Sequence, residues 1–156
     1  LPVEIQIPKI VKFLESENLF LKEHNADYLS QESLKWHPRL GIHAVNVAPE
    51  FGVCETKSLI KLLNLSNNKK LLDKFLEIAF NSRKWEKWVL KNTSLKDFEK
   101  SILCGHYVFA NNDIIELKSK LQKSLDQKGL NLNNLLKEDI KNSIKRYLKP
   151  FRMIKS

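Results

Sequence analysis

The stretch RLGIHAVNVAPEFGVCETKSLIKLL, residues 39–63, decides which fold class the sequence predicts. Its first part, GIHAVNV, is a short β-branched and half-apolar run that is typical of a buried strand. Pro49 and Gly52 then interrupt the run, and apolar residues follow at helical spacing: Leu59, Ile60, Leu62 and Leu63. A strand that ends in a polar loop and leads into a helix is typical of α/β proteins.

The same succession of elements comes before this stretch. After Pro8, the apolar positions among residues 10–14 predict a short helix, and the run Leu19–Leu21 predicts another buried strand. Ser30 is placed to cap a second short helix, which Pro38 should end. The order α-β-α-β-α with short connections predicts two parallel strands covered by helices. Two strands are too few to close a sheet.

The rest of the chain has a different character, because its apolar residues recur at helical spacing and no strand is predicted. Ser94 is a predicted helix cap, and an amphipathic closing helix should run up to Pro150. The polar segment LSNNKK is the expected boundary between the two parts. We therefore expect an α/β part in residues 1–66 and a helical region in residues 67–156.

Composition limits the class of protein. The 42% hydrophobic and 29% charged residues suit one soluble unit of ordinary size, and no apolar run approaches the roughly 18 residues that span a bilayer. Nothing at the start resembles a signal peptide, so we expect a cytoplasmic protein without membrane contact. Cys54 and Cys104 are far apart, which favours reduced thiols over a disulfide or a zinc site.

The formal charge of +9 suggests nucleic-acid binding as one function. However, the lysines are spread over every helical segment and alternate with Glu and Asp, which is typical of a solvated surface. A basic helical module that binds nucleic acid or assembles with other chains, without enzymatic activity, is the alternative to the interpretation developed below.

The chain begins at Leu1, and its single methionine is Met153. Together with the small number of predicted strands, this suggests the carboxyl-terminal part of a larger α/β protein.

Polar residues cluster after both predicted strands, where parallel α/β proteins build their sites. The first cluster consists of Glu23, His24, Asn25, Asp27 and Tyr28. Here His24 beside Asp27 suits general acid/base chemistry or metal ligation, although a structural hydrogen bond would also explain it. Glu23 follows an apolar run, so it is either a base with a raised pKa or a solvated loop residue.

The second cluster consists of Asn46 and Glu50, on either side of Ala48-Pro49. An amide beside a carboxylate suits the recognition of sugar hydroxyls or a hard divalent cation, and helix capping is the structural alternative. Because Glu50 and Glu55 oppose an anion at this helix start, we expect phosphate to bind elsewhere, with Lys57 as one candidate.

These residues suggest a family. The succession EHNADY, a Trp-containing helix and GIHAVNVAPEFGVCETKSLI, followed by KWEKWVLKNTSLKDFEKSILCGHYVF, resembles the non-catalytic subunits of class II D-tagatose-bisphosphate aldolase. The most compact motif is His-x-x-Asp-Tyr at His24, Asp27 and Tyr28. The resemblance covers most of the chain, and Asn46 and Glu50 depart from the small and apolar residues that the family mostly carries there.

The resemblance implies the carboxyl-terminal part of a (β/α)8 TIM-type barrel, with two parallel strands followed by a helical tail. It also implies a ketohexose phosphate ligand, a divalent cation (Zn or Mg), and a catalytic aldolase subunit or a second copy as partner. We expect either support of aldol cleavage or epimerisation at C4, with Glu23, His24 and Asp27 as catalytic residues. The residues expected to bind substrate are Asn25, Tyr28, Asn46, Glu50 and, from the family's tail, Tyr107.

Overall fold

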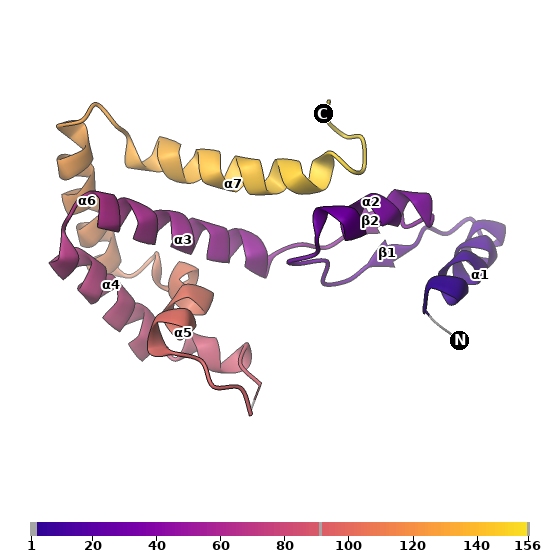
Figure 1. The fold of residues 1–156 in the computed structure, drawn as a ribbon, viewed down its shortest axis with the longest axis horizontal. Coiled ribbons are helices and arrows are strands. Elements are labelled where there is room, and N and C mark those ends of the chain that lie inside the picture. Colours follow the sequence, from indigo (N-terminus) through magenta and orange to yellow (C-terminus); the bar gives the residue numbers. More distant parts are fainter. Residues whose placement is uncertain (1–2, 91, 156) are drawn as a thin grey trace. The chain divides into compact units, whose positions relative to one another are not determined.

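Helices account for 66% of the computed structural model, which describes residues 3–90 and 92–155. The described residues divide into two compact units, each treated by itself below. Unit 1 is Leu1–Glu50 together with Asn142–Ser156, and unit 2 is Phe51–Lys141. Figure 1 shows the elements in chain order from indigo to yellow.

Unit 1 is formed by the first elements of the chain and the end of the last helix. Its elements are α1 (Val3–Ser16), β1 (Lys22–Glu23), α2 (Gln31–Arg39), β2 (Ala44–Val45), the start of α3 (Pro49–Leu65) and the end of α7 (Leu132–Leu148). Ser30 caps α2 as predicted, because its hydroxyl oxygen accepts a hydrogen bond from the backbone N–H of Ser33 at 3.0 Å. The helix continues to Arg39, with Pro38 inside its last turn, so Pro38 does not end it.

The two strands pair in parallel, as the order of elements predicted, with Lys22 opposite Ala44 and Glu23 opposite Val45. Each strand is only two residues long. The apolar residues Leu19 and Phe20, predicted to form a buried strand, precede β1, and their side chains are 53% and 78% exposed.

The predicted TIM-type barrel part is therefore wrong for this structure. The described residues are mostly helical and contain no strand long enough to form a βα barrel unit. The physical reason is that both apolar runs are short. Only two residues of each strand pair with the other strand, and Leu19 and Phe20 lie in the loop before β1. The division expected at residue 66 rests on sequence character and stays a prediction.

The elements of regular structure in the described part of unit 2 are all helices or helical turns. Besides the larger parts of α3 and α7 it contains α4 (Lys69–Asn81), the 3₁₀ turn η1 (Lys84–Lys87), α5 (Asp97–Cys104), the 3₁₀ turn η2 (Gly105–Val108) and α6 (Asn112–Asp126). Figure 1 shows α4 and α5 side by side, and the two helices contact each other extensively. The described residues after 67 contain helices and no strand, and α7 ends at Leu148, before Pro150.

The core of unit 2 is built around Phe75, whose side chain is fully buried. The chain approaches this core closely at Gly105, where a Cβ atom would lie 2.5 Å from Thr56 Cγ2 and 2.9 Å from the Phe75 ring. Glycine is therefore required by space at this position, which is also the end of α5. The cap predicted at Ser94 is wrong, since α5 begins at Asp97.

Candidate functional site

The start of α3 is fixed by a side chain from the loop after β1. Asp27 Oδ1 accepts hydrogen bonds from the backbone N–H groups of Ala48, at 3.2 Å, and Glu50, at 2.8 Å. These amides lie at the helix start, where no carbonyl within the helix can accept from them. Pro49 has no N–H and suits the first helical position. The structure thus brings Asp27 and Glu50 together, with Asp27 as a cap supplied from another loop.

Glu50 is at the centre of a cluster that also contains Arg146, Tyr147 and the backbone N–H of Tyr28. The Tyr28 N–H donates to Glu50 Oε2 at 2.5 Å, Arg146 Nη2 donates to Oε1, and the Tyr147 hydroxyl donates to Oε2. Arg146 Nη1 also donates to the Leu29 carbonyl at 2.5 Å. We call Glu50, Arg146 and Tyr147 the Glu50 clamp, because they join the start of α3, the loop after β1 and the last turn of α7.

These contacts explain the direction in which the pKa values of Glu50 and Tyr147 are shifted. Burial raises the pKa of the Glu50 carboxyl, but the hydrogen bonds from Tyr147, the Tyr28 amide and Arg146, together with the Arg146 charge, hold it below its ordinary value of 4.5. Burial and the neighbouring Glu50 carboxylate raise the pKa of the Tyr147 phenol well above its ordinary value. At neutral pH the clamp is therefore a carboxylate, a guanidinium and a protonated phenol.

Glu23 has a separate partner. Its Oε2 lies 2.6 Å from Nε2 of the buried His37, whose Nδ1 lies 2.9 Å from the Ser33 carbonyl oxygen. Both ring nitrogens therefore lie close to oxygen atoms. This arrangement links β1 to α2. The histidine beside Glu23 is therefore His37, whereas the sequence suggested His24.

The remaining predicted residues of unit 1 lie on loops. His24 and Asn25 are exposed, and Asn25 has a left-handed backbone with φ of 66°. Tyr28 is also left-handed, with φ of 62°, and its side chain is 56% exposed. The exposed Asn46 extends the strand pairing through its backbone, since its N–H donates to the Glu23 carbonyl and its carbonyl accepts from the Ala26 N–H. Their predicted roles in substrate binding or catalysis stay predictions.

Tyr107 belongs to unit 2, and its predicted role in substrate binding stays a prediction. Its ring centroid lies 3.9 Å from that of His106, and Lys87 Nζ lies 4.1 Å from the Tyr107 ring and 5.0 Å from the Trp88 ring. Burial, followed by the Lys87 charge, lowers the pKa of His106. These contacts hold η1 and η2 together.

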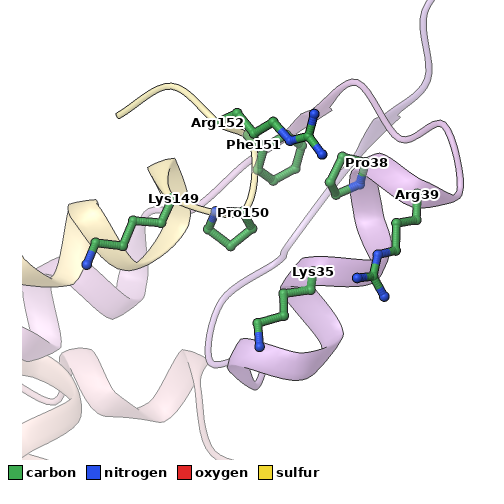
Figure 2. A pocket seen from close by; sticks show the side chains of 7 residues that line it. All are labelled: Lys35, Pro38, Arg39, Lys149, Pro150, Phe151 and Arg152. Atoms are coloured by element: carbon green, nitrogen blue, oxygen red, sulfur yellow. The ribbon is translucent and has the colours of Figure 1, made fainter. Parts of the chain in front are cut away.

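Unit 1 contains a pocket of about 520 Å³ between α2 and the segment that follows α7. Figure 2 shows one wall formed by α2 and the other by the carboxyl-terminal turn. Its lining residues are Lys35, Pro38, Arg39, Lys149, Pro150, Phe151 and Arg152. Four of the seven are cationic and none is acidic, so the lining carries four positive charges. We call it the basic pocket.

Local contacts shape both walls of the basic pocket. On α2, Arg39 lies 5.2 Å from the Trp36 ring centroid, a contact that orients the guanidinium without neutralising it. Lys35 Nζ lies 3.7 Å from Glu32, and this exposed pair contributes little binding energy of its own. In the other wall, the Arg152 N–H donates to the Lys149 carbonyl at 3.0 Å, and Arg152 has a left-handed φ of 56°.

The pocket's four cations were not singled out by the sequence, where they are four among 27 Lys and Arg residues. One signal near them is Pro150, two residues after the end of α7, because a proline indicates that the helix does not continue. Arg146 and Tyr147 were likewise predicted only as part of an amphipathic helix.

Within residues 3–90 and 92–155, no group of three or more His, Cys, Asp or Glu side chains is arranged to hold a metal ion. The divalent cation implied by the resemblance stays a prediction. In the same residues, no helix has the length and apolar character that crossing a membrane requires.

No family model, curated protein or solved structure matches the chain.

Proposed function

We propose that this protein binds a small phosphorylated ligand of the ketohexose phosphate class, and that the basic pocket is where the phosphate is held. The observation that carries the proposal is the lining, which combines two guanidinium groups and two ammonium groups with no carboxylate. A phosphate monoester carries nearly two negative charges at neutral pH and several acceptor oxygens, so it matches such a lining. Guanidinium groups add bidentate geometry to the attraction of charge.

The rest of the lining suits a small organic ligand. Pro38, Pro150 and Phe151 supply apolar surface among the charges, and small-molecule sites commonly combine apolar walls with a few polar groups. The carbon skeleton of a sugar phosphate can lie against these rings while its phosphate meets the cations. A pocket lined by charged groups alone would instead favour an inorganic anion over an organic phosphate.

The structure supports binding more directly than chemistry. Asp27 Oδ1 accepts from two backbone amides, and Glu23 Oε2 lies 2.6 Å from His37 Nε2, so both carboxylates are engaged with groups of the protein itself. Of the two roles implied by the resemblance, support of a catalytic aldolase subunit is therefore favoured over catalysis by this chain alone.

Calorimetric titration with fructose 6-phosphate, inorganic phosphate and neutral fructose tests the proposal. Wild-type protein should bind both phosphates and ignore fructose. The double variant Arg39→Gln/Lys149→Gln should bind fructose 6-phosphate about tenfold or more weakly, because each hydrogen bond to a charged group contributes about 1.5–3 kcal/mol. The matched control is Lys9→Gln/Lys12→Gln, which removes the same charge from exposed positions of α1.

Equal weakening by both double variants would mean that overall charge alone attracts the phosphate, and the pocket would then have no role. Tighter binding of a single-stranded oligonucleotide, with a steep loss of affinity as salt rises, would favour the nucleic-acid alternative.

A further inference from the structure

The second wall of the basic pocket has no regular secondary structure of its own. Lys149, Pro150, Phe151 and Arg152 form a turn directly after α7, and Lys149 and Arg152 are exposed. Such a turn is expected to be mobile unless neighbouring residues hold it. The position of two of the four pocket charges therefore depends on what anchors the end of α7.

The Glu50 clamp is that anchor. Arg146 and Tyr147 immediately precede the turn, and both donate to the Glu50 carboxylate. The Glu50 side chain is only 13% exposed, so these are strong, partly desolvated contacts. Tyr147 also lies within hydrogen-bond distance of the Ala26 carbonyl at 3.2 Å.

A weaker contact holds the middle of the turn. The Phe151 ring centroid lies 6.3 Å from that of His37 on α2. Since Phe151 lines the pocket, this contact sets how closely the turn approaches the first wall. A contact between two rings fixes no hydrogen bond, so the clamp supplies the stronger restraint.

Glu50 itself does not line the pocket. The sequence led us to expect that the Glu50 carboxylate would repel a phosphate at the start of α3. The pocket avoids this repulsion because it lies elsewhere. The charge of Glu50 is compensated by Arg146, and its three donors come from protein groups.

We propose that Glu50 is a positioning residue of the basic pocket: by holding Arg146 and Tyr147 it fixes the turn that presents Lys149 and Arg152 to the phosphate. This inference rests on the proposed function. Glu50 acts without touching the ligand, and it matters because a pre-formed pair of walls avoids the entropy cost of ordering the turn when the phosphate binds.

The test compares Glu50→Gln with Val11→Ala. The glutamine keeps the size of the side chain and removes its charge, whereas Val11→Ala removes buried surface from α1 and leaves the clamp and the pocket untouched. Both variants weaken unit 1, so a loss of affinity that follows stability alone would appear in both. Two quantities are measured for each: the affinity for fructose 6-phosphate, and the amide chemical shifts of Lys149, Phe151 and Arg152 by NMR.

We expect Glu50→Gln to bind fructose 6-phosphate about fivefold or more weakly and to shift these three amides before any ligand is added. Val11→Ala should keep wild-type affinity within about twofold and leave the amides in place. Tyr147→Phe, which removes one donor to Glu50, should act in the same direction with a smaller effect, and it serves as the test if Glu50→Gln does not fold.

Each other result has a defined meaning. If wild-type protein binds no phosphate, the proposed function fails and the positioning role fails with it. If wild-type protein binds but Glu50→Gln binds equally well, or loses no more affinity than Val11→Ala, the pocket stands and the positioning role of Glu50 is refuted.

Discussion

The Glu50 clamp predicts a specific dependence of stability on pH. Glu50→Gln removes the charge that pairs with Arg146, whose side chain is 25% exposed, and replaces one acceptor oxygen by an NH₂ group. One of the three donors then faces another donor. Removing one partner from a buried ion pair costs about 3–5 kcal/mol, and since the Glu50–Arg146 pair is partly exposed we expect a loss of about 2–3 kcal/mol at pH 7.

The sign of the pH effect follows from the lowered pKa of Glu50. A carboxyl whose pKa is lower in the folded protein stabilises the fold above the unfolded value, here 4.5, and this contribution disappears as pH falls through the folded pKa. The variant has no carboxyl to titrate at position 50. The difference in unfolding free energy between wild type and Glu50→Gln should therefore be constant from pH 7 to about pH 5 and shrink below about pH 4.5.

The fluorescence of Trp36 can be used to measure the unfolding free energy of unit 1 alone. Trp36 is the only tryptophan in residues 1–50 and 142–156, so replacing Trp85 and Trp88 by Phe leaves a single reporter. Urea unfolding of both proteins in this background, at pH 7, 5, 4 and 3, gives the difference at each pH. A difference that stays the same down to pH 3, or a loss below about 0.5 kcal/mol at pH 7, would refute the clamp as a charged and partly desolvated contact.

Two further predictions concern unit 2. Gly105→Ala should lower the free energy of unfolding by about 2 kcal/mol, because its Cβ would meet Thr56 and Phe75 in a packed core; urea unfolding measures this, and an unchanged midpoint would mean that the core yields freely. Asn68→Ala should cost about 1 kcal/mol by the same assay, since the Asn68 side chain accepts from the Leu71 N–H at the start of α4, and Asn68→Asp, which keeps an acceptor, should recover most of it.

The helices could be predicted from sequence because their determinants are local. The capping of α2 by Ser30 needs only residues three apart, and the apolar spacing of α4, α6 and α7 is visible within each helix. The parallel direction of β1 and β2 was also predictable, because a short helical connection between strands favours it.

The strands themselves were less predictable. Leu19–Leu21 is apolar enough for a buried strand, yet the pairing begins only at Lys22 and leaves Phe20 largely exposed. A run of three apolar residues does not specify whether a sheet will cover it, since burial depends on partners elsewhere in the chain. The prediction of a barrel part extended this local ambiguity to the whole fold.

Some residues of the candidate site could be predicted from the sequence, and others could not. Asp27 and Glu50 could be singled out because each follows a short apolar run, and the structure does bring them together. The side-chain partners of Glu50 could not be found from sequence, since Arg146 and Tyr147 lie 96 and 97 residues further along the chain. Nothing in the local pattern around residue 146 distinguishes that arginine from a solvated one.

The contrast between Arg146 and Arg152 shows why charge in the sequence is a poor guide to this site. The two arginines are six residues apart, but Arg146 is half-buried and neutralised by Glu50, whereas Arg152 is exposed and lines the pocket. The first arginine fixes the turn that carries the second. Without Glu50, the Arg146 guanidinium would have no carboxylate partner. An added anion could then bind Arg146 instead of the cations of the pocket. The carboxylate that seemed to oppose phosphate binding therefore directs the anion to Arg39, Lys149 and Arg152, because it already pairs with the half-buried guanidinium of Arg146.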